Sequence, residues 1–221
     1  FGGWLFGHVD IPRALEGGLT GAMWSIATNI AQPAAWRFGV LEKNVERLAA
    51  TLRGSPHVEV VRSHEEWRRA RAAGKHAALV CVQGGNAFDG ARDLSNPGAL
   101  VTRVTVVHLS NSRLGETSSP ARLGRDAGIR TPGKDFIAWL DSERIFVDLA
   151  HASEKTFWDA LAVHDRSLPA IVTHTGSSAV HPMWRNIDDR QVKAIADTGG
   201  VCGVILQRSF LGKSVKDGRV V

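Results

Sequence analysis

Six short apolar runs, rich in valine and isoleucine, alternate along the chain with segments that carry helix signals. The runs are largely continuous rather than interrupted at every second residue, which is typical of strands covered on both faces in a parallel sheet. Strand, helix, strand, helix is the order of right-handed βαβ units. The pattern therefore predicts an α/β fold. The expected strands are 19–27, 77–82, 102–107, 145–150, 169–173 and 200–206.

Four of the segments between these runs carry a helix start signal, either an N-cap residue or a proline in the first turn. We expect helices to begin after Ser63, at Thr131, after Ser153 and after Asp188. The first and last of these also have Glu or Gln three residues after the cap, which is the capping-box pattern.

A length of 221 residues suits one domain and lies near the lower edge for a (β/α)8 barrel. No repeat, low-complexity tract or charged linker divides the chain, so we expect residues 1–221 to form a single domain. Cys81 and Cys202 both lie inside apolar runs, and their spacing matches neither a metal pair nor a redox pair. We expect buried, reduced thiols.

The net charge of +5 at pH 7 raises the question of nucleic-acid binding. However, the arginines are scattered, tyrosine is absent, and no basic stripe contains aromatic residues on which bases could stack. We therefore expect no nucleic-acid partner. The longest uncharged stretch, 17–36, is broken by polar residues, glycine and proline, so we expect no membrane span. The sequence leaves the oligomeric state open, a homo-oligomer included.

Polar side chains follow four of the apolar runs at the point where each run ends. The second run ends in Gln83, and the next three end in His108, His151 and His174. Reactive groups of α/β barrels collect at the carboxyl ends of strands. One such histidine is more often structural, but three at equivalent positions suit a zinc or similar divalent site. The spacing places His151 and His174 on neighbouring strands.

At these positions the sequence resembles the renal (membrane) dipeptidase family, whose members are zinc-dependent barrels that hydrolyse dipeptides. The segment VDLAHASEKTFWDAL (147–161) is similar to the family pattern IDLSHVSxxTFxDVL. The segment 169–204 is similar to PVIASHSxAxxxxxHPRNLTDEQIRAIAxxGGVIGV. Segments 8–26, 82–88 and 104–112 extend the match. The resemblance implies a TIM-type (β/α)8 barrel of the metal-dependent hydrolase kind, with about six of its eight strands present here.

The resemblance also implies residue roles. His151 and His174 fall on the two histidines that ligate one of the family's two zinc ions. His108 falls on the histidine that contacts the substrate and polarises the scissile carbonyl. Arg185 falls on the arginine that binds the substrate, and a guanidinium suits a carboxylate. The implied reaction is attack by a metal-bridging hydroxide on the carbonyl of a dipeptide substrate.

Gln83 stands where the family has the glutamate that bridges its two metals. Two dications about 4 Å apart repel by roughly four times the ~4 kcal/mol of a unit-charge pair at an effective dielectric of 20. A neutral amide does not offset that repulsion, so we expect a weakened binuclear centre or a single metal at the histidine pair. The alternative function is a non-catalytic or single-metal relative that acts as a binding or scaffold protein.

The family's first ligands come from an Asp-x-His-x-Asp motif, which has no clear place here. Residues 7–10 contain the letters His-x-Asp, but Asp10 lies too close to the run at 19–27 for the crossover of a dozen or more residues between parallel strands. No match follows 200–206 for the family strand that carries a catalytic aspartate. We therefore expect a piece of a longer gene product, or a chain that pairs with another, with little or no dipeptidase activity alone.

Overall fold

The computed structural model describes residues 10–27, 29, 31–120, 127–212, 215–216 and 219–220. Its helices are α1 (Ile11–Glu16), α2 (Ala34–Arg53), α3 (His64–Ala72), α4 (Thr131–Ser142), α5 (Glu154–Val163), α6 (Asp189–Ala196) and α7 (Arg208–Leu211). Its strands are β1 (Gly21–Ala27), β2 (Val58–Val60), β3 (His76–Gln83), β4 (Val101–Thr105), β5 (Phe146–Asp148), β6 (Val172–Thr175), β7 (Cys202–Val204), β8 (Val215–Lys216) and β9 (Arg219–Val220).

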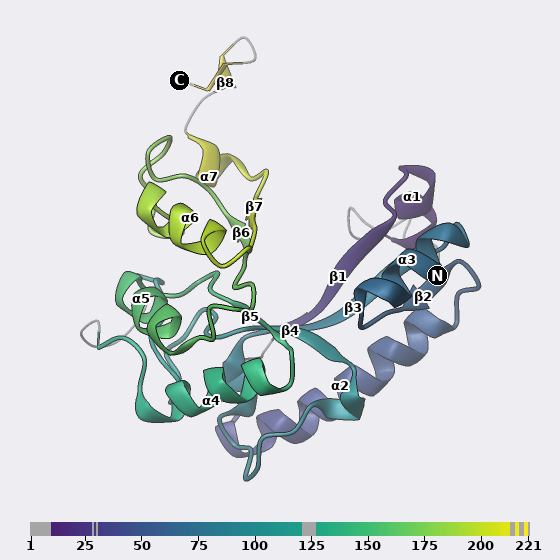
Figure 1. Cartoon of the computed structure of the whole chain (residues 1–221), viewed down its shortest axis with the longest axis horizontal. Helices are drawn as coiled ribbons and strands as arrows, with labels where there is room; N and C mark the ends of the chain where they lie inside the picture. The colour runs from purple at the N-terminus through teal and green to yellow at the C-terminus, as the bar shows by residue number, and fades with distance from the viewer. Residues whose placement is uncertain are drawn as a thin grey trace.

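The long strands form an open, parallel arc. Strands β1, β3, β4 and β5 pair in that order, and β6 pairs with β7. A parallel bridge between Asp148 and Ile171 joins the two groups. Short β2 pairs with the start of β3, on the edge that β4 occupies from Val80 onward. The fold is therefore α/β with a TIM-barrel-like succession of strands, and Figure 1 shows the arc from β1 through β5 to β7.

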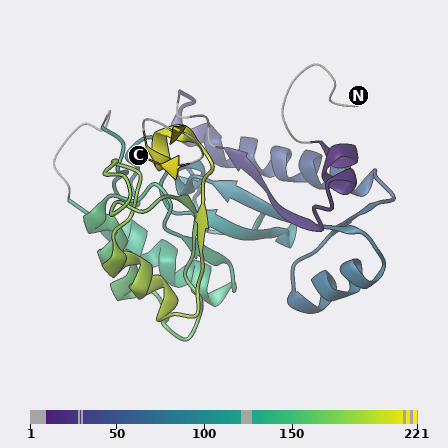
Figure 2. The ribbon, with the colours of Figure 1, turned by 90° about the horizontal axis from the view of Figure 1, so that it is seen from above.

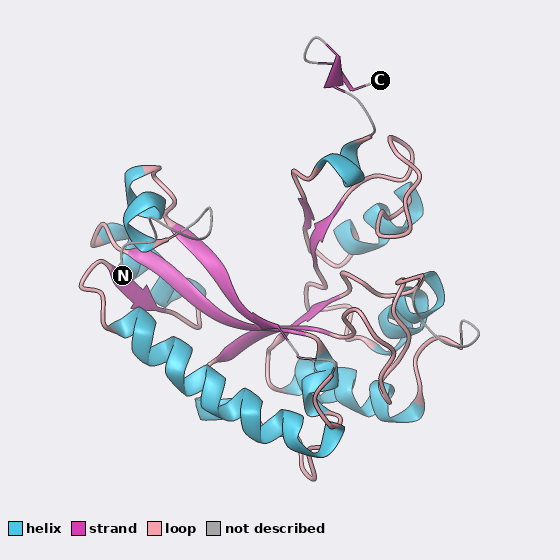
Figure 3. Cartoon of the chain, turned by 180° about the vertical axis from the view of Figure 1, so that it is seen from behind, coloured by secondary structure: helices cyan, strands magenta, loops and turns pink. Residues whose placement is uncertain are grey.

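The helices lie along the outer side of this arc. Figure 1 shows α2 and α4 beneath the central strands, with α5 and α6 beside β5 and β6. The view from above shows α2 and α3 on opposite sides of the central strands (Figure 2), and the view from behind shows the long α2 running below the magenta strands (Figure 3). A parallel arc covered in this way directs the carboxyl ends of its strands to one common edge.

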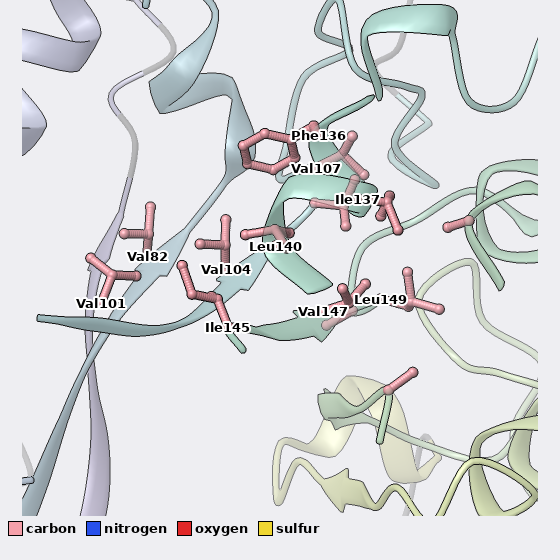
Figure 4. Packing of buried hydrophobic residues seen from close by; sticks show 14 of the residues in the cluster. Val82, Val101, Val104, Val107, Phe136, Ile137, Leu140, Ile145, Val147 and Leu149 are labelled. Carbon is pink, nitrogen blue, oxygen red and sulfur yellow. The ribbon is translucent and has the colours of Figure 1, made fainter. Parts of the chain in front are cut away.

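The core lies between the central strands and α4. Thr131 and Pro132 begin this helix, and its buried face carries Phe136, Ile137 and Leu140. These side chains pack toward valines of the central strands (Figure 4), which include Val82, Val104 and Val147. All of these side chains are almost completely buried. This packing fixes the relative positions of the strand ends that carry the candidate site.

The six expected strands are confirmed, but several boundaries shift. The fifth expected strand, 169–173, is observed as Val172–Thr175, so His174 lies inside the strand rather than after it. The sixth is shorter than expected, at Cys202–Val204. Cys81 is buried as expected, whereas Cys202 is only half-buried because it lies in β7, which pairs on one side with β6. Both cysteines are free.

The expected helix caps are largely confirmed. Asp188 and Gln191 form a complete capping box, and the Ser153 side chain caps α5. At α3 the Ser63 hydroxyl accepts from the Glu66 amide as expected. The Glu66 carboxylate, however, accepts from the amide of Arg62 rather than that of Ser63, so the reciprocal half of this box is shifted by one residue.

None of the helices among the described residues is both long enough and apolar enough to cross a membrane. Helix α2 has 20 residues, but charged side chains occupy its outer face.

A buried histidine–carboxylate pair, His164 and Asp141, makes the free energy of unfolding depend on pH. The pair lies beside the amino-terminal end of β5. His164 Nδ1 lies 2.7 Å from Asp141 Oδ1. Burial alone lowers the pKa of His164, but the hydrogen bond and charge of Asp141 outweigh it and raise the pKa above 6.5. The contribution of this pair to the free energy of unfolding is therefore fully present below pH 6.5, and it is lost as the pH rises through the raised pKa of His164.

We expect the free energy of unfolding, measured in urea at a series of pH values, to fall across that range. In Asp141→Asn the amide can still accept from the Asp165 backbone N–H, which Asp141 does here, but the charge is gone. The pH dependence should therefore flatten in this variant. An identical slope in the two proteins would contradict the role given to this pair.

Candidate metal and substrate site

One amide and three imidazoles converge at the carboxyl edge of the arc. Nε2 of Gln83 lies within 3.4 Å of a ring nitrogen of each histidine: 3.1 Å from His108, 3.4 Å from His151 and 3.3 Å from His174. Nε2 of His151 lies 2.9 Å from Nε2 of His174. Gln83 ends β3 and His174 lies within β6, whereas His108 and His151 lie three residues after β4 and β5, because these two strands end earlier than expected. The structure thus brings together the four side chains that the sequence places at strand ends.

His151 is held in an unusual backbone conformation. Its φ of 68° lies in the left-handed region, which costs free energy for a residue with a Cβ. The surrounding loop fixes this conformation, because the His151 carbonyl accepts from the Ser118 amide at 2.8 Å and from the Thr117 hydroxyl at 3.1 Å. The imidazole is thereby directed to the cluster, where its ring centroid lies 4.5 Å from that of His108 and 4.9 Å from that of His174.

Burial keeps the three imidazoles uncharged at neutral pH. Desolvation lowers the pKa of His151 to about 2, with the charge of Arg185 as the next cause. Desolvation also lowers the pKa of His174 to about 4, although the charge of Asp148 acts in the opposite direction. The pKa of His108 is lowered by burial and by Arg185. Neutral imidazoles have a nitrogen lone pair, which a divalent cation needs.

A buried ion pair lies beneath the histidines. Arg103 Nη1 is 3.3 Å from Asp148 Oδ2, and both side chains are almost fully buried. Arg103 also donates to the Val82 carbonyl at 3.0 Å, which ties β4 to the end of β3. The Asp148 carboxylate at the end of β5 accepts hydrogen bonds from Thr105 of β4, from Ala150 after β5 and from Thr173 of β6.

Arg185 lies close to the cluster and lines a cavity that His151 also lines. Its side chain is buried, and Nη2 donates to the His174 carbonyl at 3.1 Å. Burial lowers the pKa of Arg185 to about 10, so the guanidinium stays charged at neutral pH. With His151, Ser118 and Trp184 it lines a cavity of about 330 Å³. A cationic side chain at the wall of such a cavity can bind a carboxylate.

The donor set fits one cation better than two. His151 and His174 supply two converging nitrogens, and the Gln83 amide lies beside both. Within the described part of the chain, however, no group of three or more His, Cys, Asp or Glu side chains is placed to hold a metal.

The His-x-Asp letters at residues 8–10 give no support for an additional ligand. Asp10 is the N-cap of α1, where its carboxylate accepts from the Arg13 amide at 2.8 Å and pairs with the Arg13 side chain. His8 lies outside the described residues. The structural role of Asp10 agrees with our reading of this segment as a coincidental match.

The sequence matches the membrane dipeptidase family (peptidase family M19) over residues 5–217, and the chain belongs to this family. Among solved structures it is similar to dipeptidase AC, a metallopeptidase of family M19, with 25% identity and a TM-score of 0.84. That similarity covers the whole of this chain and 68% of the other. It establishes the TIM-barrel-like fold expected from the sequence.

Two curated relatives extend the comparison. An uncharacterized protein encoded in the PQQ-III 3' region of Acinetobacter calcoaceticus is 26% identical, over 94% of this chain and 72% of its own length. Dipeptidase tcpJ of Claviceps purpurea is also 26% identical, over 89% of this chain but only 48% of its own length. The chain therefore spans about half of this fungal dipeptidase.

Proposed function

We propose that this chain carries the site of a zinc-dependent dipeptidase, with one cation held by His151 and His174. The observation that carries this proposal is the 2.9 Å approach of their Nε2 atoms beside the Gln83 amide. Membership of a dipeptidase family and similarity to a metallopeptidase of that family support the same reading. Residues 1–221 are proposed to form one partial barrel domain.

A bound zinc ion would supply Lewis-acid polarisation of a carbonyl and a lower pKa for bound water. The remaining roles belong to the protein. His108, buried and neutral, lies with Nε2 3.1 Å from the Gln83 amide and with its ring beside that of His151, and it is proposed to donate a hydrogen bond to a substrate carbonyl oxygen. Arg185 is proposed to bind the substrate carboxylate in the cavity of about 330 Å³ that its side chain lines.

A second candidate is a single-metal relative that binds ligands without hydrolysing them. Gln83 favours it, because an uncharged amide stands at the position where the family resemblance places a bridging glutamate. The two candidates share the histidine pair and its single cation, and they differ in whether a bound dipeptide is hydrolysed. Zinc analysis of the purified chain tests the site: about one equivalent bound at micromolar affinity is expected, and the absence of binding would contradict both candidates.

The proposed role of Arg185 can be tested by ligand binding, without measuring hydrolysis. We expect a dipeptide with a free carboxylate to bind roughly ten- to a hundredfold more tightly than its C-terminal amide, because a charge-assisted hydrogen bond contributes about 1.5–3 kcal/mol. Arg185→Lys keeps the charge but loses the forked donor geometry, so most of this preference should disappear. Calorimetric titration measures both ligands.

The matched control is Arg69→Lys, because Arg69 is exposed on α3 and pairs with Glu59 of β2, and neither residue lines the cavity beside Arg185. Its variant should keep the full preference for the carboxylate. Equal binding of the dipeptide and its amide by the unmodified chain would refute the assignment of Arg185.

A further inference from the structure

Both oxygens of the Asp148 carboxylate accept hydrogen bonds, each from two donors. Oδ1 accepts from the backbone amides of Ala150 at 3.0 Å and Thr173 at 3.1 Å. Oδ2 accepts from the hydroxyls of Thr105 at 2.8 Å and Thr173 at 2.7 Å, and it pairs with Arg103. A carboxylate paired with an arginine can only accept hydrogen bonds. The Thr173 hydroxyl must therefore donate its proton to Asp148.

This direction determines the protonation of the neighbouring imidazole. Thr173 Oγ1 also lies 2.8 Å from Nδ1 of His174. A hydroxyl has one proton, and here that proton is given to Asp148, so the same oxygen accepts from His174. Nδ1 of His174 consequently carries the hydrogen, and Nε2 keeps its lone pair. Nε2 is the atom that faces His151 and Gln83.

We propose that Asp148 and Thr173 are positioning residues that fix His174 in the Nδ1–H tautomer with its Nε2 lone pair directed to the cation site. The role rests on the proposed metal site but is a property of the metal-free protein. It parallels the carboxylate–histidine–metal arrangements in which an outer partner sets the tautomer and ring orientation of a ligand, here with a hydroxyl between the two.

The neighbouring histidines show that this support is specific to His174. Nδ1 of His151 and Nδ1 of His108 are buried, and neither has a hydrogen-bond partner among the described residues. Their tautomers are therefore not set in the same way. His174 is the member of the pair whose tautomer is fixed from outside the cluster, and in the metal-free chain its unprotonated Nε2 accepts from Nε2–H of His151 at 2.9 Å.

The direct test is the tautomer of His174 in the metal-free chain, read from 15N chemical shifts at about pH 8, where ordinary imidazoles are neutral. We expect Nδ1 to be protonated and Nε2 to be unprotonated. Thr173→Val removes the hydroxyl but keeps the backbone N–H that Asp148 also accepts, so it should shift His174 toward the Nε2–H form. Thr173→Ser retains a hydroxyl and should restore the original signals.

Zinc affinity provides the second readout. Loss of an outer partner typically lowers metal affinity 10- to 100-fold, so Thr173→Val should bind zinc more weakly by about that factor, whereas Thr173→Ser should bind as the unmodified chain does. If Thr173 had only a structural role, the zinc affinity of both variants would change with their stability, and the tautomer of His174 would stay the same. An Nε2–H tautomer in the unmodified chain would overturn the proposal even if Thr173→Val did not fold. Absence of zinc binding together with the expected tautomer would instead refute the proposed metal site alone.

Discussion

Replacing Gln83 with glutamate is expected to raise the affinity of the histidine pair for zinc by roughly a hundredfold or more. The carboxylate would stand among three imidazole nitrogens, at the position that the amide now occupies within 3.4 Å of each. A unit charge about 4 Å from a dication contributes about 8 kcal/mol at an effective dielectric of 20, and a third of that already corresponds to a hundredfold in affinity. Metal analysis after dialysis, with calorimetric titration of zinc, measures the change.

Dipeptide hydrolysis should rise with the tighter zinc binding in Gln83→Glu if the rest of the pocket is competent. Gln83→Met is the matched control, since it is close in size and carries no charge; it should bind zinc no more tightly than the unmodified chain. Equal zinc affinity in the glutamate and methionine variants would show that the charge at this position does not limit the site. Robust dipeptidase turnover by the unmodified chain would contradict the proposed effect of Gln83.

The second large effect is the loss of zinc affinity expected when either imidazole of the His151–His174 pair is removed. His151→Ala and His174→Ala each delete one of two converging nitrogens, so zinc affinity should fall by more than the 10- to 100-fold that loss of an outer partner costs. Stability should change in parallel. Zinc at a hundred times its dissociation constant adds about 2.7 kcal/mol to the free energy of unfolding of a protein that binds it only when folded. In both variants the free energy of unfolding, measured by urea titration, should be the same with and without zinc.

His57→Ala is the control for the loss of a histidine, because His57 is exposed in the turn before β2. It should keep both the zinc affinity and the zinc-dependent stabilisation. Unchanged zinc binding in His151→Ala and His174→Ala would show that the metal binds elsewhere on the chain.

Local sequence signals were sufficient to predict the strands and helix starts that position the site. Apolar runs identified the strands, and the residue after each run identified Gln83, His108 and His151, because parallel strands end at one edge. Helix caps such as Ser153 and Asp188 were equally visible, since capping depends on residues only three apart. These features depend on neighbours in the sequence or on a general property of the fold.

Other features were missed because their signal is weak or non-local. Helix α2 has no side-chain cap, its N-cap being Pro33, although Leu41, Val45 and Leu52 form a buried stripe at helical spacing that could have revealed it. Strand β2 has only three residues, too few for a pattern. The support of His174 by Asp148 depends on contacts between different strands, and the sequence shows none of these pairings.

The central claim is that His151 and His174 hold one cation between their Nε2 atoms. The most direct measurement is X-ray diffraction at the zinc absorption edge from crystals of the chain grown with zinc. The account predicts one strong anomalous peak about 2.0–2.1 Å from Nε2 of both residues. Zinc bound at another place, with these two rings turned away from each other, would contradict it.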